Sequence, residues 1–231
     1  MQALPNSSYT MKPEMKTTHK EIDTVLSTLQ RKLGTSTMLG RMGKKYDAFK
    51  VLISTILSAR AKDEVTEEVA EELFKKYPDA KHLARAKKPD VAKIIRRIGF
   101  YNAKSENIIK SSKIIIEKYK GKIPTKLNEL LTLPGVGRKV ANCVLVYAFK
   151  KDAIPVDIHV HRISNRLGWV KTKTPEETEK ELMKLIPKKH WQAVNDTFVT
   201  FGKTICTPIS PFCSKCPIYK HCKRIGVKRS R

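Results

Sequence analysis

The sequence predicts an all-α protein, and three observations carry this prediction. Apolar residues recur at helical spacing through most of the chain, capping signals precede several of these segments, and no stretch alternates apolar and polar residues as a half-exposed strand does. The clearest pattern runs from Phe49 to Leu57, where apolar side chains fall at i, i+3, i+4, i+7 and i+8. We therefore expect helices packed on one another and no sheet.

The remaining helices are expected from the same periodicity, taken in chain order. Residues 1–19 lack any periodicity and are expected to be a disordered extension. The expected helices cover 20–33, 46–58, a segment starting near 63, 91–98, 108–119, 125–131, 138–149, a segment starting near 157, one starting near 175, and 191–202.

Three of these helices begin at recognisable signals. Asp63 and Asp157 are placed to act as N-caps, because a short carboxylate can accept a hydrogen bond from the first free amides. Thr174 and Glu177 form a capping box, with Pro175 at the first helical position. Gly99 and Gly202 are expected to stop the helices that precede them.

The charge of the chain indicates a polyanionic partner. Its 231 residues include 47 Lys and Arg against 22 Asp and Glu, for a net charge of +25. A heat-adapted surface would raise Glu together with Lys, which is not seen here, so nucleic acid is favoured. No apolar run is long enough for a membrane span and no secretory signal is evident. We expect no membrane partner and a cytoplasmic, nucleoid-associated location, or a nuclear one in a eukaryote.

Four of the five cysteines form a cluster near the end of the chain. Cys206, Cys213, Cys216 and Cys222 are separated by six, two and five residues, whereas Cys143 stands apart. An odd number without a secretory signal argues against disulfides. Four crowded thiolates need a cation, and both zinc and an iron–sulfur cluster accept four cysteines. A single C-x-x-C pair flanked by longer loops favours iron–sulfur and leaves zinc open.

The segment from Leu133 to Lys139 reads LPGVGRK and is expected to be a tight turn between two helices. Pro134 sets the turn, the glycines permit unusual backbone angles, and the following helix begins with free amides that suit a phosphate. A plain helix connection would use the same residues. Lys139 alone could be an ordinary phosphate contact, and Asp157 alone an ordinary cap.

Taken together, these segments resemble the endonuclease III family of helix–hairpin–helix DNA glycosylases. The resemblance rests on LPGVGRK at 133–139, VDIHVHR at 156–162, the cysteine spacing, LSARAKD at 57–63 and GFYNAK at 99–104. It extends over residues 20–224. It implies a two-domain fold: a six-helix barrel at 41–151 with the helix–hairpin–helix at about 126–149, and a cluster domain from 20–40 and 152–224. Residues 225–231 are then a loose basic tail.

The resemblance also implies an activity. Lys139 and Asp157 are expected to be catalytic, and the four clustered cysteines to hold a [4Fe–4S] cluster. The chain is expected to excise oxidised pyrimidines, such as thymine glycol, from double-stranded DNA and to cut at abasic sites, acting as a monomer. A neutral lysine would attack C1′, and the resulting Schiff base would permit β-elimination on the 3′ side. This chemistry requires a depressed pKa for Lys139.

Two positions depart from the family pattern. Arg60 stands where many members have Gln in the gap left by the flipped base, and Phe100 where Leu commonly wedges the opposite strand. A mismatch or purine-lesion glycosylase therefore stays open, as does a non-catalytic DNA-binding protein, and Phe100 could equally be a core residue. The residues expected to contact DNA are Arg60, Phe100, Tyr101, Asn102, Lys104, Gly135, Val136, Gly137 and Arg138.

Overall fold

The fold is all-helical, as the periodicity predicts. A computed structural model describes residues 17–34 and 37–231, and all regular structure in these ranges is helical. The helix predicted at 20–33 is α1 (His19–Leu33). His19, which was expected to belong to the disordered extension, is therefore helical. Residues 1–16 of that extension lie outside the described part of the chain. No helix in the described ranges is both long and apolar enough to cross a bilayer.

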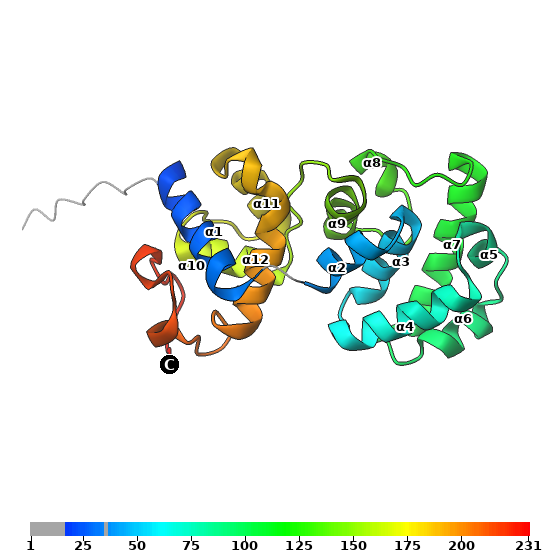
Figure 1. Cartoon of the computed structure of the whole chain (residues 1–231), viewed down its shortest axis with the longest axis horizontal. Coiled ribbons are helices and arrows are strands. Elements are labelled where there is room, and N and C mark those ends of the chain that lie inside the picture. The colour runs from blue at the N-terminus through cyan, green and yellow to red at the C-terminus, as the bar shows by residue number, and fades with distance from the viewer. Residues whose placement is uncertain (1–16, 35–36) are drawn as a thin grey trace, which may run out of the picture.

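The helices form two units that lie side by side (Figure 1). The first unit contains α2 (Met38–Lys45), α3 (Ala48–Ser58), α4 (Asp63–Lys76), α5 (Ala80–Ala84), α6 (Lys88–Ile95), α7 (Tyr101–Tyr119), α8 (Leu127–Leu130) and α9 (Arg138–Phe149). The second contains α1, α10 (Ile158–Leu167), α11 (Pro175–Leu185), α12 (Trp191–Thr204) and three short 3-10 turns, Lys188–His190, Cys213–Lys215 and Tyr219–His221.

The core of the first unit is centred on α3. From Val51 to Leu57 every residue of this helix is buried, because α2, α4, α7 and α9 all pack against it. A helix that is apolar on most of its surface belongs in the interior. This core runs from Met38 to Ala153, so it begins before residue 41, where the sequence placed the boundary.

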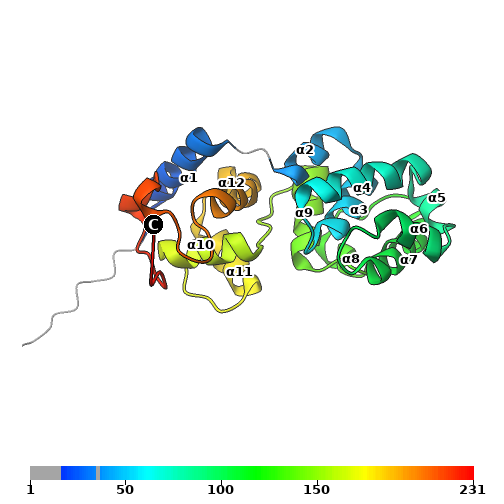
Figure 2. The same ribbon diagram turned by 90° about the horizontal axis from the view of Figure 1, so that it is seen from below.

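The second unit joins distant parts of the chain. The apolar face of α1 (Ile22, Val25, Leu26 and Leu29) is fully buried and packs on α12. Figure 2 shows α1 beside α12, although the whole first unit lies between these two helices in the sequence. The core of this unit resumes at Ile154 and ends at Ile218.

All three helices begin where the local signals predicted, but only two of the three expected caps form. The Asp157 carboxylate caps α10, and the Thr174 hydroxyl caps α11 by accepting from Glu177 N at 3.2 Å. Asp63 is not a cap: Lys62 occupies that position, and Asp63 pairs with Lys203 of α12 at 2.5 Å. The helix ends predicted at Gly99 and Gly202 also differ from the structure. Helix α6 ends earlier, at Ile95, and α12 continues past Gly202 to Thr204.

The basic tail is not loose at its last residue. Arg231 N donates to Pro211 O at 2.8 Å, Arg231 O accepts from Ser214 N at 3.0 Å, and the guanidinium stacks over Phe212 at 4.0 Å from the ring centre. The tail therefore closes over the cysteine-bearing loop, with an arginine–aromatic contact that composition alone does not reveal.

Candidate active site

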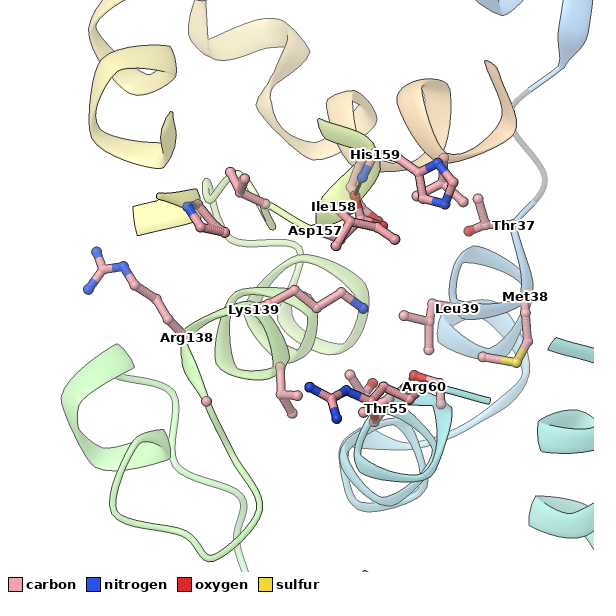
Figure 3. A pocket seen from close by; sticks show the side chains of 18 of the residues that line it. Thr37, Met38, Leu39, Thr55, Arg60, Arg138, Lys139, Asp157, Ile158 and His159 are labelled. Atoms are coloured by element: carbon pink, nitrogen blue, oxygen red, sulfur yellow. Dashed lines mark hydrogen bonds between the residues drawn. The ribbon is translucent and has the colours of Figure 1, made fainter. Parts of the chain in front are cut away.

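A cleft of about 610 Å³ opens where the two units meet. Its walls come from α2, α3 and α9 of the first unit and from α10, α11 and α12 of the second. Lys139 lies on the first side and Asp157 on the second (Figure 3). The structure therefore brings the two predicted catalytic residues into one cavity, and we call this pair the floor of the cleft.

Lys139 extends from the first turn of α9 into the cavity. In Figure 3 its amine lies between Asp157 and Arg60 and faces Leu39. No carboxylate within the described ranges forms an ion pair with it. Cys143, one helical turn further along α9, is fully buried and its sulfur contacts the amine. The lysine is therefore neither pinned in a salt bridge nor hidden behind the hairpin.

The pKa of Lys139 differs from the expectation. Burial lowers this pKa, but the Cys143 sulfur and the Asp157 and Asp63 carboxylates raise it, and the net direction is upward. Burial in turn raises the pKa of the Cys143 thiol. The prediction of a depressed pKa is wrong for the free protein, and the amine must lose a proton during the reaction.

Asp157 is held rigidly by the helix that it caps. Its Oδ1 accepts from His159 N and Val160 N, both at 2.9 Å. Oδ2 has no hydrogen-bond donor among the described residues, so one carboxylate oxygen remains available to the cleft. The cap that the sequence indicated thus also orients a charged group toward Lys139.

The hairpin turn packs closely on α7. Gly135 has φ +80°, and a Cβ there would lie 3.0 Å from Asn107 Cβ, so glycine satisfies both the backbone angle and the close approach. Ser111 Oγ donates to Pro134 O at 2.8 Å. No side chain caps the start of α9, which leaves the amides after Gly137 open to a phosphate.

Val136 does not fit its predicted role in DNA binding. Its side chain is 7% exposed and lies in the core of the first unit, and its amide donates to Leu133 O at 3.0 Å. Both groups are therefore occupied within the protein. The alternation of exposed and buried positions in such a short turn cannot be read from the sequence.

Arg138 is engaged by a residue that sequence reasoning missed. Its guanidinium forms a forked ion pair with Glu179 of α11, at 2.8 and 3.0 Å, and the Glu179 side chain is only 5% exposed. The pair joins the hairpin to the second unit, so the Arg138 guanidinium already binds a carboxylate although its side chain is one-third exposed. A signal did exist, because Glu179 lies on the buried face of α11 beside Thr178 and Leu182.

A second polar contact between the units was also missed. Tyr147 of α9 donates its hydroxyl to Asp196 Oδ1 of α12 at 2.6 Å, and Thr37 hydrogen-bonds to the same carboxylate oxygen. Burial raises the pKa of Asp196 and raises that of Tyr147 well above its usual range. The wall between the units thus contains satisfied polar groups that fix one unit against the other.

Arg60 lines the cleft and Phe100 lies beside it, and we call these two residues the lip. Phe100 is 63% exposed, so it is not a core residue, and the Arg60 guanidinium lies 5.5 Å from its ring centre. Both have left-handed backbones, with φ of 55° and 61°. Tyr101 and Asn102 are exposed beside them at the start of α7. These four predicted DNA contacts are accessible on one side of the molecule.

Lys104 is not accessible, and its prediction as a DNA contact is wrong. It is 7% exposed, and its amine donates to Leu57 O at 2.8 Å and to Ala59 O at 2.6 Å. Burial lowers the pKa of Lys104 to about 8. A lysine in a basic sequence resembles a surface residue until tertiary packing covers it.

The four clustered cysteines surround one small cavity, lined otherwise by apolar residues such as Phe201 and Ile218. All are free thiols, and Arg166 Nη1 donates to Cys206 Sγ at 3.4 Å. In the described part of the chain, no three His, Cys, Asp or Glu side chains converge as a single metal ion requires. Four cysteine sulfurs around one cavity are a donor set that either a zinc ion or an iron–sulfur cluster accepts.

The cysteine loop is connected to the cleft through α10. Arg162 Nη2 lies 3.0 Å from His159 Nδ1 and donates to Cys206 O at 2.9 Å. His159 itself lines the cleft beside Asp157, and burial lowers its pKa, so it is neutral at pH 7. Hydrogen bonds therefore run from the loop that carries the cysteines, through Arg162, to His159, two residues after Asp157.

Comparison with known proteins identifies relatives of this architecture. Residues 53–188 match the family described as HhH-GPD superfamily base excision DNA repair protein. Endonuclease III of Thermotoga maritima is 52% identical over 183 residues, which covers 79% of this chain and 86% of the relative. Endonuclease III of Bacillus subtilis is 39% identical, covering 79% of this chain and 84% of the relative.

Solved structures show the same fold. A trapped covalent intermediate of endonuclease III with DNA matches with a TM-score of 0.82 and 35% identity, over 90% of this chain and 97% of that one. A thermostable thymine-DNA glycosylase matches with a TM-score of 0.79 and 25% identity, over 89% and 96% of the respective chains.

Proposed function

Since the chain belongs to the endonuclease III family of base excision repair glycosylases, we propose that it is bifunctional, excising oxidised pyrimidines from duplex DNA and then cleaving the strand through Lys139. The observation that carries this proposal is the floor of the cleft. An unpaired amine and a carboxylate with one open oxygen face each other there from opposite units.

The cleft suits a nucleotide turned out of the helix. A volume of about 610 Å³ lies within the range of small-molecule sites, which is about 300–1,000 Å³. A base inside the stack hides its C1′ atom, so an enzyme acting there must extrude the nucleotide. The open amides after Gly137 are placed to bind a phosphate next to it.

The chemistry assigns one role to each floor residue. The Lys139 nitrogen attacks C1′, forming the new C–N bond while the glycosidic bond breaks and the base leaves with a proton. Ring opening gives a protonated Schiff base, which acidifies the C2′ hydrogen, and its loss breaks the C3′–O bond. Asp157 is the nearby acceptor for the proton that Lys139 must release, and it stabilises positive charge on the sugar.

Arg60 and Phe100 are the groups that we assign to the duplex itself. Exposed apolar and cationic side chains at the mouth of such a cleft fit insertion between base steps and into the gap left by the extruded base. One structural relative is a thymine-DNA glycosylase, so removal of a mismatched thymine is the alternative activity. Because a single chain supplies both sides of the cleft, we propose that the monomer is the active form. We also propose that it acts in the compartment that contains the DNA, the nucleoid or the nucleus.

The four clustered cysteines are the residues that would hold a [4Fe–4S] cluster. Such a cluster supplies iron–thiolate bonds that cross-link the loop, while the Arg166 guanidinium and the Arg224 amide donate to Cys206 and Cys222 sulfurs. We assign the group a structural role beside the catalytic cleft. Visible absorption of the purified protein, with iron and sulfide analysis, separates it from zinc.

The decisive experiment incubates the protein with a thymine-glycol duplex in the presence of borohydride, which reduces a Schiff base to a stable link. We expect a covalent protein–DNA band, and its loss by more than about 10³-fold in Lys139→Ala. Absence of the band in the wild type, or its persistence in Lys139→Ala, would overturn the proposal. Faster release of a mismatched thymine in a parallel panel would favour the alternative.

A further inference from the structure

We propose that Lys104 is a positioning residue that holds the two halves of the lip together, so that Arg60 and Phe100 enter the duplex as one preassembled wedge. This inference rests on the function proposed above, and it concerns a side chain that cannot itself reach DNA. Two contacts and one feature of the backbone carry it.

The first contact is between the Lys104 amine and the end of α3. The last carbonyls of a helix have no partner within the helix, and burying them without one is costly. Lys104 donates to two of them, Leu57 O and Ala59 O. A cation at this end also interacts favourably with the helix dipole. The amine therefore fixes the turn at the residue directly before Arg60.

The second contact is through the backbone of the same residue. Lys104 N donates to Phe100 O at 3.0 Å, as the first hydrogen bond of α7. Lys104 thus bonds through its main chain to the turn that carries Phe100, and through its side chain to the turn that carries Arg60. The two turns also approach directly, since a Cβ on Gly99 would lie 3.5 Å from Arg60 O.

The third observation is the strain in the lip. Arg60 and Phe100 both have positive φ, which is uncommon for residues with a side chain and persists only where the surroundings enforce it. Neither side chain is packed in the core, so their own contacts cannot enforce it. We assign this constraint on the two backbones to the buried hydrogen bonds of Lys104. With the turns fixed, the guanidinium stacks on the Phe100 ring.

The test compares Lys104→Met, which keeps the length of the side chain but removes its donors, with Lys113→Met on the exposed part of the same helix. Each protein is trapped with borohydride on an oligonucleotide containing one abasic site, either single-stranded or annealed to its complement. Only the duplex has to be opened and filled. We expect Lys104→Met to be roughly ten- to a hundredfold slower on the duplex, with single-strand trapping and the control variant unchanged.

A second comparison places Lys104→Met in a background that already lacks the lip, Arg60→Ala with Phe100→Ala. If Lys104 acts through these residues, the triple variant is no slower on the duplex than the double variant. Equal losses on both substrates, or an additive loss in the triple variant, would show a general structural role and overturn the inference. If the wild-type protein is not trapped on the single-stranded abasic oligonucleotide, that result would instead count against the proposed function.

Circular dichroism melting checks that each variant is folded. If Lys104→Met does not fold, Lys104→Gln takes its place, because its amide still donates to one of the two carbonyls. The inference then requires a smaller duplex defect with the same absence of any single-strand defect, and a defect shared by both substrates contradicts it.

Discussion

At the floor of the cleft, Lys139 and Asp157 are partly buried, and the Asp157 carboxylate is held by two backbone amides. At the lip, Arg60 and Phe100 are exposed, and only the turns beneath them are held. The floor is shaped for one sugar, and the lip is shaped for the helix that surrounds it. A defect in the floor should therefore appear on every DNA substrate, whereas a defect in the lip should appear only on a duplex.

Among the variants that test this difference between floor and lip, Asp157→Asn is expected to reduce the trapping rate the most. Asparagine caps a helix about as well as aspartate, so α10 should persist. We expect a roughly 10²- to 10⁴-fold slower trapping rate on duplex and single strand alike. Because the Asp157 carboxylate raises the pKa of Lys139, its removal should also move the rising limb of the pH–rate profile to lower pH. A limb that moves upward would contradict the assigned contact.

The next effect concerns how the floor is supported. Glu179→Ala removes the partner of Arg138 and leaves that guanidinium, one-third exposed, without its carboxylate. Breaking a buried pair costs about 3–5 kcal/mol, and the partial exposure of Arg138 reduces this to roughly 1–3 kcal/mol. Chemical denaturation should show this loss, with weaker trapping on both substrates. Glu181→Ala, on the exposed side of the same helix, is the matched control.

A variant of the lip should slow trapping on duplex DNA without slowing it on single-stranded DNA. Phe100→Ala removes the exposed ring, and we expect about tenfold slower trapping on duplex abasic DNA, with no change on the single strand. Ile116→Ala, an exposed apolar position (37%) near the other end of α7, serves as the control. An equal loss on both substrates would mean that Phe100 supports the floor, and the division between floor and lip would fail.

The smallest effect is expected from the exposed ion pair that joins the units, Lys203 with Asp63. Both side chains are substantially solvated, at 47% and 33% exposure. Lys203→Met should lower the free energy of unfolding by less than about 1 kcal/mol, and by nothing measurable at high salt. A larger loss would show that this pair, and not Arg138 with Glu179, holds the cleft closed.

The features that could be predicted from the sequence are those decided by residues close together in the chain. The helix at 138–149 was predicted with its correct ends, and the Asp157 cap was recognised, because both are decided by neighbouring residues. Lys104 and Val136 were misassigned and the Glu179 partner of Arg138 was missed, because these contacts are made with other parts of the fold. The cysteine spacing predicted a metal site, but only the folded loop shows that all four cysteines line one small cavity.

The division of the second unit between both ends of the chain has a consequence for biosynthesis. Helix α1 leaves the ribosome before α12, on which its apolar face packs, so this face stays uncovered while the intervening residues are made. The first unit closes its core from the continuous segment 38–153 and can fold on the nascent chain. Docking of α1 must then await the release of α12.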